Sequence, residues 1–330
     1  VMYREKNQEG QVFGGPMYVI KNGLPRKMLP LAYFFAIAGM IGCLPAFQSN
    51  QLIQITGDLA FSDIENFNVY GGLALASITG IVVIGGLKRI AEVASYLVPF
   101  MGSIYFGAML IAIFLNLELV VPAFKLIFID AFNGTAIAGG TFIGVLIYGV
   151  RRGAFSNEAG MGTESLVHGV AKVSNPVKQG LVAMTGPIFD TLIICTATAL
   201  IILISGVWET STSQGVTLTS EAFNLLLGDL GGFILFACVI CFGLSTIFTY
   251  SYYGATCARF IFGSFGMNFY IYLYIIGIFI YSIVPIDIAI NIADGAFAMM
   301  AIPTLISALW LAPKVMQESK NYFKLINNIS

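Results

Sequence analysis

Long apolar stretches that carry almost no charge dominate this sequence. A helix that crosses a bilayer needs about 20 mostly apolar residues. Eight stretches of this kind follow one another, at 28–55, 69–87, 92–116, 137–152, 177–206, 231–262, 268–285 and 288–313. Only 10% of the residues are charged, against about 25% in soluble domains. The sequence therefore predicts an all-α integral membrane protein with about eight transmembrane helices, surrounded by a lipid bilayer.

The distribution of basic residues predicts the orientation of these helices. If residues 1–27 lie on one side, every one of the 16 lysine and arginine residues except Lys125 falls on that side. Lysine and arginine accumulate in cytoplasmic loops. We therefore predict a cytoplasmic loop at 1–27 and a cytoplasmic tail at 314–330, with both ends of the chain in the cytoplasm. The net charge of −1 gives no indication of a nucleic-acid partner.

The sequence offers little for catalysis or for a resident metal. It contains one histidine and five cysteines, and no cysteine pair has zinc-ligand spacing with a histidine nearby. No Ser-His-Asp set and no paired intramembrane aspartates of the hydrolase kind are present. We therefore predict no enzyme and no cofactor.

Polar residues interrupt the first apolar stretch. Gln48 and Gln51 are three residues apart and share a helix face, which Gln54 continues, with Phe47 beside them. One interpretation is a wall of a polar substrate cavity. The other is hydrogen bonding between helices near the membrane surface, and the residues alone leave both open.

Glycines interrupt the fourth stretch, at Gly139, Gly140 and Gly144. A broken membrane helix exposes backbone carbonyls and N–H groups that can hold an ion or a zwitterion. Close helix packing through small residues four apart is the alternative, and Gly140 and Gly144 have that spacing.

A polar segment follows at 151–162, with Arg152, Asn157 and Glu158 packed between small residues. It could form a hydrogen-bonded gate or a support for the site. Asp190 and Thr191 lie in the fifth stretch, and the eighth contains further acids. A buried acid in a membrane helix can pair, take a proton or carry coupling.

Two adjacent hydroxyl residues, Ser245 and Thr246, follow a glycine in the sixth stretch. Hydroxyls and carbonyls suit a monovalent cation such as Na⁺. Serine and threonine also bond back to the preceding helical turn in membrane helices, so the local chemistry leaves a structural role open.

Several runs together resemble the alanine or glycine:cation symporters, the sodium:alanine symporter family. These runs are GGPMY at 14–18, GGLKRI at 85–90, VPFM at 98–101, GVRRGAFSNEAG at 149–160 and FDTLIICTAT at 189–198. The resemblance implies a leucine-transporter-type fold of two five-helix inverted repeats plus one extra helix, eleven spans in all. We therefore expect the chain to be the C-terminal three-quarters of such a protein, truncated at its N-terminus. Residues 28–116 would be the remainder of the first repeat, 117–136 an extracellular loop and 137–313 the second repeat.

The resemblance also implies a function and roles for residues. The family takes up alanine or glycine with Na⁺ across the plasma membrane of bacteria or archaea, and H⁺ is the alternative coupling ion. The implied partners are a small neutral amino acid and a sodium ion, and no oligomer is required. Another cation-coupled amino-acid transporter of the same fold, or an inactive fragment without the first helices, is the competing interpretation. The implied roles are substrate binding for Phe47, Gln48, Gln51, Gly139, Gly140 and Gly144, sodium binding for Ser245 and Thr246, and a gate or structural motif for Arg152, Asn157, Glu158, Asp190 and Thr191.

Overall fold

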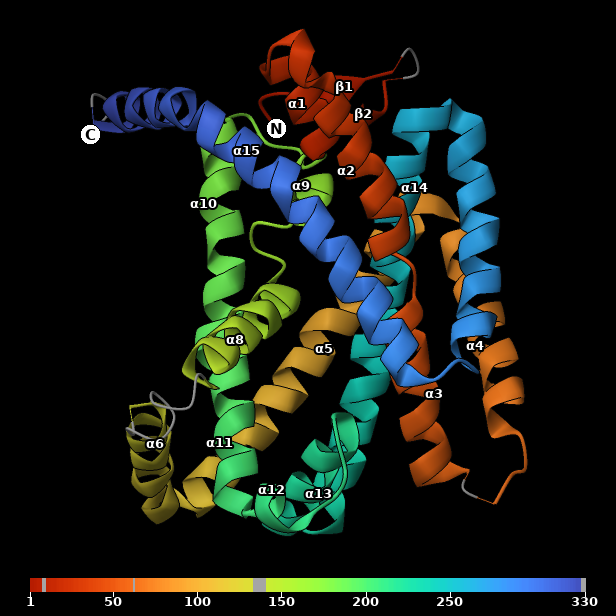
Figure 1. Ribbon diagram of the computed structural model, residues 1–330, viewed down its shortest axis with the longest axis vertical. Coiled ribbons are helices and arrows are strands. Elements are labelled where there is room, and N and C mark those ends of the chain that lie inside the picture. Colours follow the sequence, from red (N-terminus) through yellow and green to blue (C-terminus); the bar gives the residue numbers. More distant parts are fainter. Residues whose placement is uncertain (8–9, 62, 133–140, 328–330) are drawn as a thin grey trace.

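A computed structural model describes residues 1–7, 10–61, 63–132 and 141–327. Within these residues the chain is almost entirely helical (Figure 1), which confirms the predicted all-α class. A short hairpin departs from this pattern, because β1 (Glu5–Lys6) pairs antiparallel with β2 (Val12–Phe13). Both ends of the chain lie at the same end of the molecule (Figure 1).

The first part of the chain contains one hairpin and a series of helices. After the hairpin come α1 (Pro16–Gly23), η1 (Arg26–Met28), α2 (Leu29–Gly42), α3 (Ala46–Ala60), α4 (Phe67–Val83), α5 (Gly86–Leu115) and α6 (Leu117–Ala131). The helix α6 occupies most of a segment that the sequence predicts as an extracellular loop.

The predicted span 28–55 is divided at Cys43-Leu44-Pro45 into α2 and α3. Proline has no N–H to donate to the preceding turn, and it disfavours the helical conformation of the residue before it. The prediction of one continuous helix is therefore wrong at this point. The hydrophobicity of Cys43 and Leu44 conceals the interruption from a count of apolar residues.

The second part of the chain contains longer helices. They are α8 (Thr141–Asn157), α9 (Glu164–His168), α10 (Pro176–Pro187), the π-helical η2 (Ile188–Cys195), α11 (Thr196–Ser205), α12 (Val207–Thr210), α13 (Val216–Leu227), α14 (Asp229–Tyr281) and α15 (Ile286–Asn327). The helix α15 continues through Pro313 into the segment that the sequence predicts as a tail.

The helix α14 has 53 residues, and a straight helix of that length would measure about 80 Å, more than twice the hydrocarbon core of a bilayer. The helix is interrupted at Gly263, whose backbone angles are non-helical, φ 69° and ψ −157°. Glycine adopts such angles easily. The chain turns there, and the two arms of α14 run side by side (Figure 1). This matches the separate predicted spans 231–262 and 268–285.

Five helices among the described residues are long and apolar enough to cross a membrane. They are Arg26–Ala60, Gly86–Leu115, Pro176–Ser205, Asp229–Tyr281 and Ile290–Asn327. The first counts α2 and α3 together, and the fourth counts both arms of α14. The shorter α4 is apolar over 17 residues. The chain is thus a multi-pass helical protein, and the predicted count of eight spans stays a prediction.

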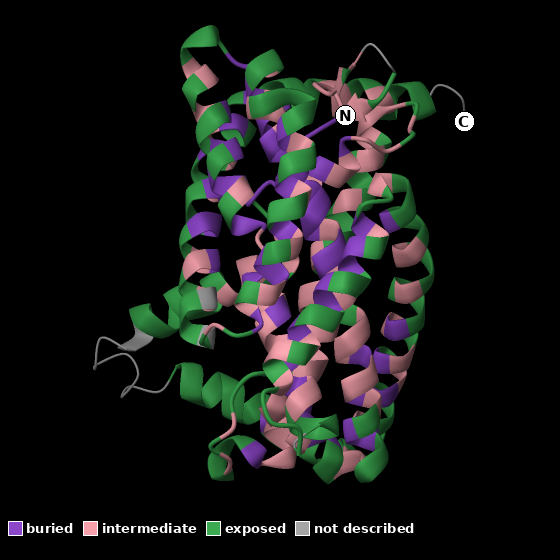
Figure 2. Ribbon diagram, turned by 90° about the vertical axis from the view of Figure 1, so that its right-hand side faces the viewer, coloured by how far each residue is buried: buried purple, intermediate pink, exposed green. Residues whose placement is uncertain are grey.

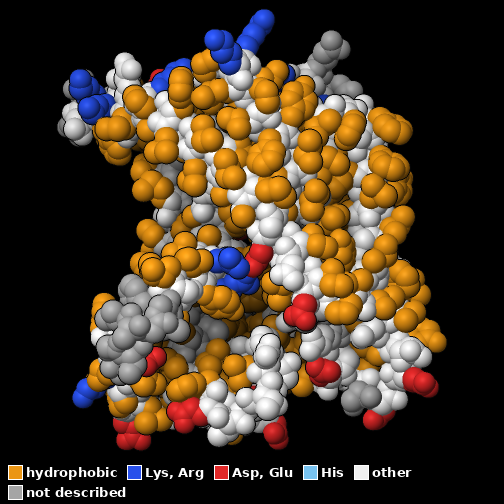
Figure 3. All heavy atoms as spheres, viewed as in Figure 1, with side chains coloured by type: hydrophobic (Ala, Val, Ile, Leu, Met, Phe, Trp, Pro, Cys, Tyr) orange, Lys and Arg blue, Asp and Glu red, His pale blue; other side chains and the backbone are white. Residues whose placement is uncertain are grey.

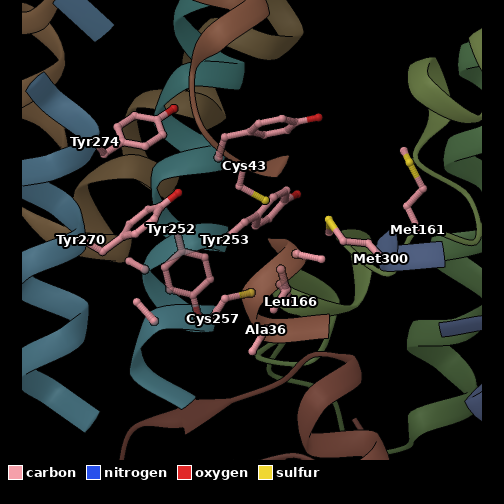
Figure 4. Packing of buried hydrophobic residues seen from close by; sticks show 14 of the residues in the cluster. Ala36, Cys43, Met161, Leu166, Tyr252, Tyr253, Cys257, Tyr270, Tyr274 and Met300 are labelled. Atoms are coloured by element: carbon pink, nitrogen blue, oxygen red, sulfur yellow. The ribbon is translucent and has the colours of Figure 1, made fainter. Parts of the chain in front are cut away.

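The main core lies where the two arms of α14 meet α2 and α15 (Figures 2 and 4). The Tyr270 hydroxyl of the second arm donates to the Met40 carbonyl at 2.8 Å, and the fully buried Tyr274 donates to the Ile247 carbonyl of the first arm at 2.7 Å. A Cβ on Gly39 would lie 2.7 Å from the Cys257 sulfur, so α2 and α14 approach closely. Five of the buried residues labelled in Figure 4 are called the α14 hairpin core below. They are Cys43, Tyr253, Cys257, Tyr270 and Tyr274.

Charged side chains gather at the two ends of the molecule. Figure 3 shows lysine and arginine side chains mainly at the end that carries both termini, and aspartate and glutamate side chains mainly at the opposite end. Most of the middle of this face is covered with hydrophobic side chains, apart from a few basic and acidic side chains at mid-height. This distribution of charge suits a protein whose middle section is embedded in a lipid bilayer.

Candidate functional site

The polar segment predicted from the sequence forms the last turns of α8 and the sharp turn after it. The helix ends at Asn157, whose Oδ1 accepts a hydrogen bond from the Ala159 N–H at 2.9 Å. Glu158 has a φ of 56° and Gly160 a φ of 82°, so the chain leaves the helix through left-handed conformations. A positive φ is uncommon for a residue other than glycine. The turn therefore fixes the side chains of Asn157 and Glu158 in different directions.

An ion pair joins α8 to α15. The Arg152 Nη2 lies 2.7 Å from Asp294 Oδ1 and 2.5 Å from Oδ2. Arg151 Nη1 lies 3.9 Å from the same carboxylate. The Arg152 guanidinium also packs over the Phe155 ring, 5.3 Å from its centroid. The Asp294 side chain is only 16% exposed, and a carboxylate at such a site needs a cationic partner.

Three hydrogen bonds join the end of α8 to the π-helical segment η2, one of them between Ser156 Oγ and Cys195 Sγ at 3.3 Å. Ser156 Oγ donates to Asp190 Oδ2 at 2.7 Å, and Asn157 Nδ2 donates to Thr191 Oγ1 at 2.8 Å. Thr196 Oγ1 donates to the Thr191 carbonyl at 3.2 Å, five residues earlier. Short π-helical segments inside helices often occur at functional sites. Here the segment presents Asp190 and Thr191 to α8.

A further hydrogen bond joins the turn after α8 to the first arm of α14. The buried Tyr250 hydroxyl donates to Glu158 Oε1 at 2.5 Å. The Tyr250 ring lies 5.6 Å from the Tyr253 ring of the α14 hairpin core. We call the four contacts Arg152–Asp294, Ser156–Asp190, Asn157–Thr191 and Glu158–Tyr250 the α8 junction.

Aromatic rings connect the α8 junction to α3. Phe47, at the start of α3, packs edge-on against Phe155 with ring centroids 5.5 Å apart, and Phe155 packs against Phe297 of α15 at 5.3 Å. A pocket of about 450 Å³ lies between α8 and α15, lined in part by Phe155, Asn291, Asp294 and Phe297. Figure 3 shows a hollow at mid-height on this face, with basic and acidic side chains at its edge. The junction thus combines charges, amide groups and an aromatic wall beside open space.

The sequence pattern of the sodium:alanine symporter family matches residues 1–328. The chain belongs to this family. It is 34% identical to the sodium/alanine symporter AgcS of Methanococcus maripaludis, over 99% of this chain and 73% of the length of AgcS. It is 36% identical to the uncharacterized transporter YflA of Bacillus subtilis, over 96% of this chain and 67% of that protein. The probable sodium/glutamine symporter GlnT of Bacillus subtilis is 32% identical over 97% of this chain and 66% of that protein.

Membership of the sodium:alanine symporter family makes the chain a membrane transporter and not an enzyme. The family match covers the whole chain, so it does not support the expectation that the chain is the C-terminal three-quarters of such a protein. The resemblance in the sequence runs at 149–160 and 189–198 is confirmed as a family relationship. In the structure these two runs meet at the α8 junction.

The structure brings together the residues that the sequence assigns to a gate or structural motif. Arg152, Asn157 and Glu158 each contact another element, and Asp190 and Thr191 receive the contacts from Ser156 and Asn157. The predicted substrate residue Phe47 joins them through Phe155. Their roles in transport stay predictions.

Other predicted substrate residues lie apart from the α8 junction. Gln51 Nε2 donates to Gln54 Oε1 at 3.1 Å, and its Oε1 lies 3.1 Å from the position of a Cβ on Gly215, in the chain before α13. Gln48 is half-buried on α3. The interpretation that these glutamines share one face holds for Gln51 and Gln54, and a substrate contact stays a prediction.

The structure describes only part of the segment in which the sequence predicts a glycine break. Gly139 and Gly140 lie outside the described residues. Gly144 lies inside α8, which is helical from Thr141 to Asn157, so Gly144 does not itself open the backbone. That part of the expectation is wrong, because an isolated glycine inside a helix lowers its stability by only about 1 kcal/mol and does not break it. Gly144 is exposed, and a Cβ there would meet nothing within 4 Å, so close helix packing does not explain this glycine among the described residues.

Ser245 and Thr246 lie in the first arm of α14. Ser245 is 6% exposed, and its hydroxyl donates to the Phe242 carbonyl at 3.0 Å. This is the backbone interaction expected of a helical serine. Thr246, the next residue, is half-buried.

Sequence reasoning did not select Tyr250, Ser156, Phe155 and Phe297, and it noted Asp294 without assigning a partner. An acid inside a membrane helix signals a buried partner, but Arg152 and Asp294 are 142 residues apart. Aromatic residues at helical spacing are ordinary in membrane helices. Only the fold shows which of them face the junction.

Proposed function

We propose that the protein is a sodium-coupled symporter of small neutral amino acids, alanine or glycine, that works by alternating access in the plasma membrane of a bacterium or archaeon. The observation that carries this proposal is the family match over residues 1–328. The name of the relative AgcS, a sodium/alanine symporter, supports the substrate and the ion. The gathering of basic side chains at the end with both termini (Figure 3) supports a cytoplasmic position for that end.

In this mechanism α8 is the element that moves. Several of its apolar side chains are exposed, for example Ile143 at 64% and Val145 at 68%, so its first part has little packing against the other residues that the structure describes. Its last part is held by the α8 junction. These polar contacts are few and directional, and a transition between two conformations can exchange one set of such contacts for another. We propose that they close one side of the pathway.

The proposed substrate contacts lie on either side of α8. Phe47 and Phe155, whose ring centroids lie 5.5 Å apart, form an aromatic wall. This wall limits the size of a substrate side chain that can enter, so it favours alanine or glycine by excluding larger amino acids. Gln48, Gln51 and the predicted glycine break at Gly139 and Gly140 would face the amino acid, as in the midplane sites of secondary transporters. The hydroxyls of Ser245 and Thr246 would hold Na⁺. The inward gradient then drives uptake, with about 2.3 kcal/mol per charge for each 100 mV of membrane potential.

Uptake of radiolabelled alanine into proteoliposomes tests this function. We expect saturable uptake under an inward Na⁺ gradient and none when choline replaces Na⁺. Uptake that rises linearly with alanine concentration, or that continues without Na⁺, would contradict the proposal. The first result indicates a pore, and the second indicates a different coupling ion.

A second candidate is a transporter for another amino acid or with a proton as coupling ion. Two relatives support testing it, since one carries the name sodium/glutamine symporter and another the name sodium/proton-dependent alanine carrier protein. Competition of labelled alanine with unlabelled glycine and glutamine separates the substrates. A proton gradient without Na⁺ separates the ions.

A further inference from the structure

A basic cavity lies outside the α8 junction, at the end of the molecule that carries both termini. It has a volume of about 520 Å³ and is formed by α1, the start of α2 and the turn of α14 at Gly263. The helix α2 enters the bundle at Leu29, directly after η1, and α14 reverses at Gly263. These two points place the cavity where apolar helices begin and end, which is the level of lipid headgroups.

The lining of the cavity has an excess of positive charge. Lys21, Arg26 and Arg259 line it, and Glu5 is the acidic residue among its lining residues. Glu5 is already paired with Lys21 at 2.8 Å. Within residues 1–7, 10–61, 63–132 and 141–327, no carboxylate forms an ion pair with Arg26 or Arg259. The cavity therefore attracts an anion.

Arg259 is held in place by packing. Its guanidinium lies over the Phe13 ring, 3.7 Å from the centroid, and Nη1 points to the sulfur of Met267 at 3.9 Å. Because neither partner carries a charge, the positive charge of Arg259 is not neutralised. A planar guanidinium held in this way is suited to bind phosphate oxygens.

An apolar wall adjoins the basic groups. Leu29, Tyr33 and Phe260 line the same cavity, and the Tyr33 and Phe260 rings lie 5.3 Å apart. Tyr33 is 43% exposed on the outside of α2. An anion that also has an acyl chain could place the chain along this wall, and a free phosphate ion would leave the wall unused.

We propose that this cavity binds the phosphate of an anionic phospholipid, with its headgroup between Arg26 and Arg259 and its acyl chain along Tyr33 and Phe260. Basic cavities between membrane helices are suited to acidic lipid headgroups. This proposal needs only insertion into a membrane, so it stands or falls separately from the transport function.

Native mass spectrometry of the protein, exchanged into equal amounts of phosphatidylglycerol and phosphatidylcholine, tests the proposal. We expect the wild-type protein to retain phosphatidylglycerol in excess. Arg26→Gln and Arg259→Gln should each lower its excess about fivefold. Because Arg26 is exposed, Arg26→Gln should fold. It therefore still tests the proposal if Arg259→Gln does not fold. Lys27→Gln is the matched control, because Lys27 is an exposed neighbour that does not line the cavity.

Three outcomes would overturn the proposal. Equal retention of the two lipids shows that the cavity does not select an anionic lipid. An equal loss in Lys27→Gln and Arg26→Gln shows a diffuse surface charge instead of a site. Thermal stabilisation of the lipid-free protein by inorganic phosphate, lost in Arg26→Gln and without any preference between the lipids, shows a phosphate-ion site.

Discussion

In the α14 hairpin core, Tyr274 is fully buried and its hydroxyl bonds to the carbonyl of Ile247 in the opposite arm. At the α8 junction, by contrast, the Arg152 side chain is 31% exposed although it carries the ion pair to Asp294. The core gains its stability from the close packing of its side chains and from hydrogen bonds between helices. The junction depends on a few charged and polar contacts, each of which needs a specific partner. The first arrangement resists displacement, and the second can be switched.

The two regions are joined by Tyr250. Its ring packs near Tyr253 of the core, and its hydroxyl donates to Glu158 at the junction. In the proposed mechanism, a movement of α8 would reach α14 through the buried Tyr250 side chain. This division suits a transporter, which needs a fixed scaffold and a movable gate.

The comparison predicts the largest effect on stability in the core. Tyr274→Ala should lower the free energy of unfolding by about 3–5 kcal/mol, because it removes a fully buried aromatic ring and leaves a cavity. Thermal unfolding in detergent measures the change. Tyr272→Ala, at a position that is 60% exposed, is the matched control and should change stability by less than about 0.5 kcal/mol. Equal effects at the two positions would mean that the core does not hold the scaffold.

At the junction we expect a large effect on transport and a smaller one on stability. Asp294→Asn leaves the Arg152 charge without its partner. Because the Arg152 side chain is 31% exposed, water partly solvates that charge, and the loss of folding stability should stay below about 2 kcal/mol. Alanine uptake should fall more than about tenfold, since 1.4 kcal/mol already corresponds to a factor of ten. Asp287→Asn is the control, because Asp287 is an exposed acid on the same helix. Similar uptake by both variants would remove the ion pair from the mechanism.

A change at the aromatic wall should alter selectivity. Phe47→Ala removes the ring that packs on Phe155, and the enlarged pocket should admit larger neutral amino acids such as leucine. The ratio of leucine to alanine uptake should rise about tenfold, the size of a typical pocket effect of 1–3 kcal/mol. Phe114→Ala, at a 65% exposed position of α5, should leave the ratio unchanged. An unaltered ratio in Phe47→Ala would exclude Phe47 from the pocket.

The smallest expected effect concerns sodium. Thr246→Ala should raise the Na⁺ concentration for half-maximal uptake about three- to tenfold, since one oxygen ligand is lost. Thr256→Ala is the control, because Thr256 lies ten residues further along α14 and its hydroxyl donates to the Tyr252 carbonyl at 2.8 Å. If the two variants need the same Na⁺ concentration, Thr246 is not a sodium ligand.

The sequence predicted the two arms of α14 better than the contacts of the α8 junction. Apolar stretches of sufficient length give the helices directly, and the interval between 262 and 268 gives the turn at Gly263. The same reasoning failed at Pro45, because Cys43 and Leu44 keep the stretch apolar where the helix stops. Hydrophobicity reports the surroundings of a helix and says little about its continuity.

The partners at the junction could not be derived from the sequence. Asn157 and Thr191 are 34 residues apart, and Glu158 and Tyr250 are 92 apart, so their contacts depend on how the helices pack. The π-helical turns of η2 change which residues face α8, and an apolar stretch gives no sign of them. The sequence did single out the polar groups at 151–162 and 190–191, since uncompensated polar groups in a membrane are costly, but it did not predict their contact.

Hydrogen–deuterium exchange of the membrane-embedded protein tests the central claim that α8 moves against a fixed α14. We expect amides of Thr141–Asn157 to exchange faster than those of the first arm of α14. Addition of Na⁺ with alanine should change the exchange of α8 by at least about tenfold while α14 stays unchanged. Equal protection of the two helices, with no response of α8 to Na⁺ and alanine, would contradict the account.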